Sequence, residues 1–188
     1  MAIMPPSRTL LRRFPALIVV ATLALPGGCG GDESPDNAVE AQEQNVAELG
    51  GVRYRAVLFR QLNVRGAPDD ALWEGGTPHS DRGLYAVFLR ACAAGREPVR
   101  TSERIHLEDA FGQRFAPRAA DTADTFEYSV TPLAPGECSP EAGSAADRTF
   151  DGAALVFSVP FASVQERPMI LEIADPTGGG TARIQLDL

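Results

Sequence analysis

The residues best suited to chemistry lie in one stretch, from Asn63 to Arg82. They are Asp69, Asp70, Trp73, Glu74, His79 and Asp81. Carboxylates near a histidine can transfer protons in hydrolysis or hold a metal ion, and a tryptophan between acids can stack on a sugar or peptide. A long loop in a compact domain is often functional. We therefore take Asp69, Asp70, Trp73, Glu74 and His79 as candidate binding residues. The alternative is that the tryptophan caps the open end of the fold and that the acids around it are simply solvated.

The common catalytic motifs are missing from the sequence. It contains no Gly-x-Ser-x-Gly, His-Glu-x-x-His, Cys-x-x-Cys or phosphate-binding Gly-x-x-x-x-Gly-Lys. The other histidine, His106, alternates with apolar residues beside Glu108, which is typical of an exposed histidine on a strand. We predict no catalytic residue, no metal and no cofactor. Two alternatives stay open: an exported hydrolase that uses the Asn63–Arg82 loop, and a metal carrier that uses the acids near His79.

The elements that would position these residues are short strands. Apolar residues recur every second position along much of the chain after Val52, beginning with Val52, Tyr54, Ala56 and Leu58 on one face. Gly83 to Cys92 is apolar on both faces, as in a central strand covered from both sides. Further strands are predicted around residues 105–107, 126–130, 153–159, 169–173 and 182–188. Turn residues separate these runs, with tight turns at Asp109–Gly112 and Thr177–Gly180. Together they predict an all-β, immunoglobulin-like β-sandwich of about eight strands over residues 52–188.

Two short segments outside the strands are predicted to have other structures. Residues Ala162 to Glu166 are predicted to form one helical turn, and the polar stretch Ser139 to Arg148 to form a mobile surface loop.

The N-terminus has the pattern of an export signal. Arg8, Arg12 and Arg13 precede an apolar run from Phe14 to Leu25, which is shorter than the roughly 20 residues that span a bilayer. Gly27 and Gly28 then precede Cys29. The pattern resembles the signal peptide of bacterial lipoproteins, in which this cysteine receives the lipid, although Pro26 stands where leucine is preferred. We expect residues 1–29 to be the signal peptide, Cys29 the lipid attachment site, and the protein to be held at the outer side of the bacterial cell membrane. The alternative is ordinary secretion.

The segment from residue 30 to residue 51 is acidic, without a basic or aromatic side chain. Such a composition buries too little apolar surface to offset the entropy of ordering. We predict a flexible tether, in which Ala38 to Leu49 can form a short marginal helix.

Charge narrows the possible partners. The chain beyond Cys29 carries 14 basic residues, all of them arginine, against 25 acidic ones, a net charge of −11. A nucleic-acid partner requires a basic surface, so it is excluded. We expect contact with the membrane through the N-terminal lipid and an envelope protein or glycan as partner.

Two cysteines, Cys92 and Cys138, remain after Cys29 is assigned to the lipid. An even number outside the cytoplasm favours a disulfide, here across a loop of about 47 residues, worth about 4 kcal/mol in the chain-entropy model. The alternative is a pair of buried free thiols.

The order of several short motifs resembles a known family. Strand Leu84–Cys92 is followed by Pro98-Val99, Ile105-x-Leu107-x-Asp109 and Gly112-x-x-Phe115. Leu133-x-Pro135-Gly136-Glu137 and Leu155-Val-Phe157-x-Val159-Pro160 come later. This order is similar to the telokin-like, immunoglobulin-fold domains of bacterial lipoproteins, a family of unknown function. The resemblance implies a sandwich with an envelope role and no reaction. With the export signal, it favours a lipid-anchored, non-enzymatic binding module.

Overall fold

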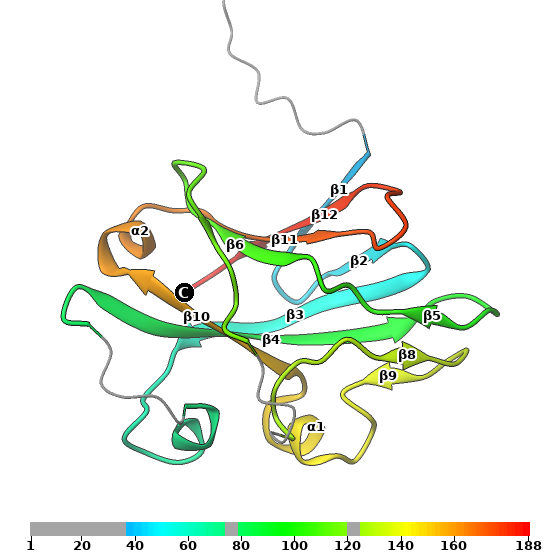
Figure 1. The fold of residues 1–188 in the computed structure, drawn as a ribbon, viewed down its shortest axis with the longest axis horizontal. Helices are drawn as coiled ribbons and strands as arrows, with labels where there is room; N and C mark the ends of the chain where they lie inside the picture. The colour runs from blue at the N-terminus through cyan, green and yellow to red at the C-terminus, as the bar shows by residue number, and fades with distance from the viewer. Residues whose placement is uncertain (1–36, 74–78, 120–124) are drawn as a thin grey trace, which may run out of the picture. The chain divides into compact units, whose positions relative to one another are not determined.

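The computed structural model describes residues 37–73, 79–119 and 125–188 as two packed β-sheets. Sheet A contains, in spatial order, β1 (Ala38–Gln42), β12 (Thr181–Leu186), β11 (Met169–Ala174), β6 (Ile105–Glu108) and β7 (Arg114–Phe115). Sheet B contains β10 (Ala153–Pro160), β4 (Arg82–Ala93), β3 (Val52–Gln61) and β2 (Val46–Leu49), with β9 (Cys138–Ser139) beside β4. β5 (Val99–Arg100) and β8 (Pro132–Leu133) form a separate pair. Figure 1 shows the two main layers.

The predicted all-β sandwich is confirmed. Within the described residues, eight strands have four or more residues, and the others have two. Sheet A places β6, β11 and β12 side by side, while sheet B places β3, β4 and β10 side by side. This division of strands between two layers is of the immunoglobulin type.

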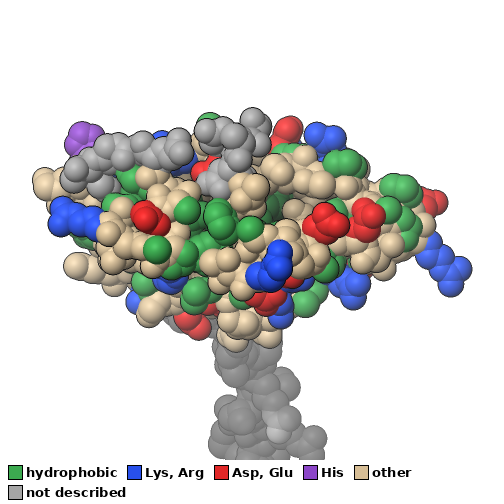
Figure 2. Space-filling view, turned by 90° about the horizontal axis from the view of Figure 1, so that it is seen from below, with side chains coloured by type: hydrophobic (Ala, Val, Ile, Leu, Met, Phe, Trp, Pro, Cys, Tyr) green, Lys and Arg blue, Asp and Glu red, His purple; other side chains and the backbone are tan. Residues whose placement is uncertain are grey.

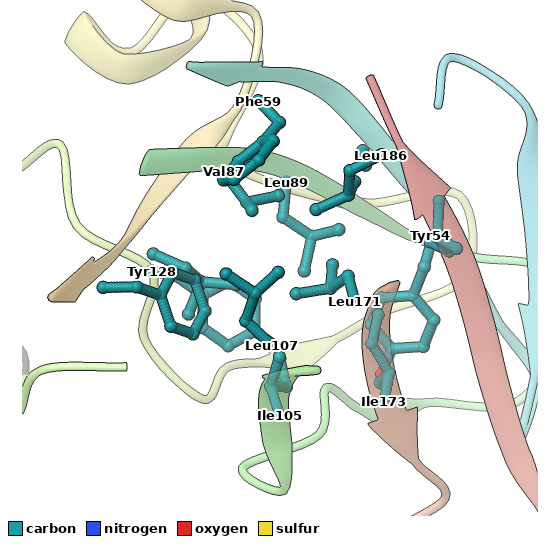
Figure 3. Close-up of a cluster of buried hydrophobic side chains, with 14 of the residues drawn as sticks. Tyr54, Phe59, Val87, Leu89, Ile105, Leu107, Tyr128, Leu171, Ile173 and Leu186 are labelled. Carbon is teal, nitrogen blue, oxygen red and sulfur yellow. The ribbon is translucent and has the colours of Figure 1, made fainter. Parts of the chain in front are cut away.

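The predicted central strand, β4, separates two hydrophobic clusters. Tyr85, Val87 and Leu89 point into the main core between the sheets, whereas Leu84 and Phe88 belong to a second cluster on the outer face of sheet B. Figure 3 shows the main core, where Leu107 and Ile105 of β6 lie across from Val87 and Leu89 of β4. The second cluster is covered by η1 (Asp69–Leu72) and α1 (Ala145–Phe150), whose Leu72 and Phe150 pack there. Burial on both faces explains why the sequence of β4 shows no alternation.

The predicted face of β3 is wrong at its second half. Val52, Tyr54 and Ala56 are buried as expected, but Leu58 is 39% exposed and Phe59 fills the core instead. The pairing with β4 shifts register between Ala56 and Leu58. Because side chains alternate with period two, one extra residue at a bulge transfers the following positions to the other face.

The N-terminal boundary of the domain is also wrong. Ala38 to Leu49 forms neither a tether nor a helix: β1 pairs in parallel with β12, and β2 pairs with β3. Gln44 has a positive φ and, with the turn around it, carries the chain from one sheet to the other. Ala47 and Leu49 of β2 are buried in the main core. The apolar positions are few, but they alternate, so the segment needs only one buried face.

This correction gives a stability prediction. Leu49→Ala is expected to lower the free energy of unfolding by about 2–3 kcal/mol, because it leaves a cavity in the core. Val46→Ala, at a position of the same strand that is 56% exposed, should change it by less than about 0.5 kcal/mol. Urea unfolding of both variants measures the difference. Equal, small effects would restore the tether interpretation.

Several local predictions have mixed outcomes. The turns at 109–112 and 177–180 are confirmed, as is the helical turn, which is α2 (Phe161–Gln165). Residues 126–130 form no strand; Glu127 makes an isolated bridge to Ala154. The Ser139–Arg148 segment is not a loop throughout, because α1 begins within it. There Ser144 caps the helix by accepting a hydrogen bond from the Asp147 backbone N–H.

The export segment and Cys29 lie outside the described residues, as does the beginning of the acidic segment, through residue 36. Among the described residues, no helix is long and apolar enough to cross a membrane.

Candidate functional site

Within the Asn63–Arg82 loop, Asp69 has a structural position. Its carboxylate is buried and receives two hydrogen bonds from the Arg60 guanidinium, at 2.5 and 2.6 Å, and one from the Asn63 backbone N–H at 2.8 Å. Arg60 in turn lies over the Phe88 ring, 5.3 Å from its centroid. The hydrogen bond from Arg60 holds the pKa of Asp69 below its usual value despite burial. Asp69 therefore fastens the loop to the outer face of sheet B.

Trp73 has a similar role. It packs against the second hydrophobic cluster, and the Arg118 guanidinium carbon lies 3.8 Å from its ring centroid. Arg118 is itself fixed by a hydrogen bond from its backbone N–H to the Val156 carbonyl. This agrees more with the capping alternative than with an exposed ligand platform, although Trp73 covers a face of sheet B rather than the open end.

The other candidate residues of the loop have no comparable position among the described residues. Asp70 and His79 are exposed, and Glu74 lies outside the described residues. The face that carries η1 and α1 is shown in Figure 2, where acidic and basic side chains are interspersed around hydrophobic ones. The loop is thus joined to the sandwich through Asp69 and Trp73, and a binding role for its residues stays a prediction.

The predicted cysteine pair is bonded. The Cys92 and Cys138 sulfurs are 2.07 Å apart, and the two residues lie opposite each other on β4 and β9. A half-open cavity of about 490 Å³ lies beside the disulfide, lined by Leu133, Glu137 and Cys138 among others. The sequence alone does not predict this cavity.

A group of charged and titratable side chains lies close together on the outer face of sheet A. Strand register places Glu40, Arg183, Glu172 and His106 in one transverse row across β1, β12, β11 and β6. The next row along β6 pairs Glu108 with Arg114 of β7. We call His106, Glu108 and Glu172, with Arg114 and Arg183, the outer-face cluster.

Each carboxylate of the outer-face cluster divides its two oxygens between different partners. Arg183 donates to Glu172 Oε2 at 2.6 Å and to Glu108 Oε1 at 3.1 Å. The other oxygens have different partners: Arg114 donates to Glu108 Oε2 at 3.0 Å, while Glu172 Oε1 lies 3.3 Å from His106 Nε2. Arg183 therefore joins the two carboxylates, and Arg114, whose side chain is 58% exposed, contacts the oxygen of each carboxylate that Arg183 leaves.

Burial and neighbouring charges shift the pKa values of His106 and Glu108. Burial lowers the pKa of His106 below 6.5; Glu172 and Glu108 raise it, whereas Arg114 and Arg183 lower it further. Burial raises the pKa of Glu108, but the hydrogen bonds from Arg183 and Arg114 outweigh it, so this pKa lies below 4.5. At neutral pH the cluster therefore combines a neutral imidazole with ionised Glu108.

A pH dependence of stability follows from the lowered pKa of His106. The unfolded chain takes up a proton at about pH 6.5, before the folded chain does, so acidification below that pH favours the unfolded state. The free energy of unfolding of the wild type should therefore fall between pH 7.5 and 5.5 more steeply than that of His106→Gln. Urea unfolding across this range measures it, with His79→Gln as the control for losing a histidine. A relative gain of wild-type stability on acidification would contradict the prediction.

Sequence reasoning missed this cluster although it noted His106 beside Glu108. The signal present was alternation: His106, Glu172 and Arg183 each stand between buried apolar neighbours on their strands. What it could not provide was the register that sets these three residues opposite one another.

Comparisons by sequence assign the chain to no family. No family model matches the chain, and no curated protein matches it in sequence. The telokin-like family membership therefore stays a prediction.

Solved structures are similar in fold. A candidate lipoprotein of Bacillus subtilis (ycdA) superposes with a TM-score of 0.50 at 8% identity, over 78% of this chain and 39% of that one. An uncharacterized β-sandwich protein of Clostridium difficile gives 0.44 at 11% identity, over 84% of this chain and 98% of that one. A conserved hypothetical protein of Bacillus anthracis gives 0.42 at 10%, over 71% and 89%. The chain thus spans well under half of the B. subtilis protein, and the likeness concerns the β-sandwich.

Proposed function

We propose that the chain is a lipid-anchored, extracytoplasmic β-sandwich that serves as a non-enzymatic binding module in the cell envelope. The observation that carries the location is the Cys92–Cys138 disulfide, because disulfides persist in oxidising compartments and are rare in cytosolic proteins. The basic and apolar lead to Cys29 supports export independently. The B. subtilis protein of similar fold, itself a candidate lipoprotein, is consistent with this proposal.

The non-enzymatic part of the proposal is supported by how the loop residues are used. Asp69 is bound to Arg60, and Trp73 is stacked on Arg118 and packed on sheet B. Both side chains are thus occupied in holding the loop. A rigid sandwich that presents loops on its surface suits recognition of a protein or glycan.

The location is tested by expressing the full chain in a bacterial host with radiolabelled palmitate. The wild type should carry label and enter the detergent phase on phase partitioning, whereas Cys29→Ala should carry none and partition into water. Cys92→Ala is the matched control for losing a cysteine and should stay labelled. Unprocessed protein in the cytosol, with Cys92 and Cys138 reacting freely with a thiol reagent, would overturn the proposal.

The binding role is tested by cross-linking intact cells and identifying what is attached. The anchored protein should recover one envelope protein or glycan above the level of Cys29→Ala, which lacks the anchor and is not concentrated at the membrane. Recovery equal to that of an unrelated lipoprotein would count against a binding module.

A further inference from the structure

The outer-face cluster contains an unusual combination of donors for an ion-pair network. His106, Glu108 and Glu172 each offer one ligand atom, and these three atoms lie within 4.8 Å of one another. Ligands around one tetrahedral zinc ion lie about 3.3 Å apart, as bond lengths of about 2.0–2.1 Å require. The three donors therefore need to move together by about 1.5 Å or less, which side-chain rotation on a fixed sheet can provide.

The state of His106 Nε2 points to a ligand. This nitrogen is buried and makes no hydrogen bond, although Glu172 Oε1 lies 3.3 Å away; it is the one buried side-chain atom without a hydrogen bond among the described residues. Buried polar atoms are nearly always satisfied, so an exception requires a reason. When the ring carries its proton on Nδ1, Nε2 presents a lone pair, which a metal ion can accept.

Arg183 orients the carboxylates of both Glu108 and Glu172. Arg183 donates to Glu172 Oε2 and Glu108 Oε1, which leaves the second oxygen of each carboxylate for another partner. These second oxygens contact Arg114, whose side chain is the most exposed of the cluster. Arg114 thus occupies the place of a cation, and it can leave into solvent without disturbing the core.

We propose that His106, Glu108 and Glu172 bind a divalent transition-metal ion of the zinc class, which replaces the Arg114 guanidinium. One imidazole nitrogen and two carboxylate oxygens are ligands that zinc accepts. Arg183 stays in place as the positioning residue that keeps both carboxylates oriented. The site is on the sheet and does not depend on the lipid anchor or on an envelope partner, so it goes beyond the proposed function.

Isothermal titration calorimetry tests the site, with zinc added to the metal-free, full-length protein in detergent. The wild type should bind one equivalent. His106→Gln should weaken binding by at least about tenfold, since even indirect supports of a metal ligand are worth 10–100-fold. Arg114→Gln should tighten binding about tenfold, because it removes the positive charge that competes with the metal for Glu108 and Glu172. His79→Gln is the matched control and should bind like the wild type.

Two further readings separate the site from a structural ion-pair network. Zinc should shift the imidazole resonances of His106 in the NMR spectrum but not those of His79, and excess calcium should not displace it, because calcium prefers oxygen ligands alone. Far-UV circular dichroism checks that every variant is folded. Wild-type affinity in His106→Gln, weaker binding in Arg114→Gln, or no zinc uptake by the wild type at about 1 mM zinc would overturn the proposal.

Discussion

Replacing both Cys92 and Cys138 by alanine is expected to lower the free energy of unfolding by about 4 kcal/mol. The bond joins residues 46 positions apart, and cross-linking a loop of that size removes about this much chain entropy from the unfolded state. For a domain of this size the melting temperature should fall by about 12 °C. Differential scanning calorimetry or urea unfolding measures the loss.

The control uses reductant. Dithiothreitol should bring the wild type to the stability of the double variant and leave the double variant unchanged. The bridge encloses β5 to β8, which contribute strands to sheet A and to the β5–β8 pair, while its two ends hold β9 against β4. It therefore restricts the connection between the layers. Coincident unfolding curves with and without reductant would show that the unfolded chain is already restricted there, and would refute the entropic argument.

The β-sandwich could be predicted from the sequence because most core strands have a recognisable local pattern of apolar residues. The continuous apolar run of β4 and the alternation of β12 each follow from which faces are covered. The failures occurred where a long-range partner decides the structure. β1 and β2 have few apolar residues and form because β12 and β3 offer them an edge. The bulge between Ala56 and Leu58 likewise depends on the pairing with β4.

The features of the candidate site also differ in whether the sequence could predict them. The cysteine pairing could be predicted, since only two cysteines were left once Cys29 was set aside. The acids of the Asn63–Arg82 loop could be noted, but the sequence did not indicate that Asp69 faces Arg60 while Asp70 faces solvent. The outer-face cluster draws its members from four strands between residues 105 and 183. Its assembly depends on register, which a single sequence does not provide.

Asp69→Ala should show whether the loop residues are structural. We expect it to lower the free energy of unfolding by about 3 kcal/mol, the low end of the range for breaking a buried ion pair. The low end applies because the Arg60 side chain is 30% exposed and can recover some hydration. The Asn63 backbone N–H also loses its acceptor. Asp70→Ala, the adjacent and exposed acid, is the matched control and should change stability by less than about 0.5 kcal/mol.

A double-mutant cycle with Arg60→Ala identifies the pair as the cause. The losses of unfolding free energy in the two single variants should add up to more than the loss in the double variant, because each single variant leaves one charge without its partner. The pH dependence gives an independent check. Since the folded pKa of Asp69 lies below its unfolded value, its contribution is complete above about pH 5 and is lost as the pH falls through the folded pKa. Asp69→Ala should remove that acid-sensitive part. Wild-type stability in Asp69→Ala would instead mean that its carboxylate is free for a ligand, and would return the Asn63–Arg82 loop to the position of leading binding site.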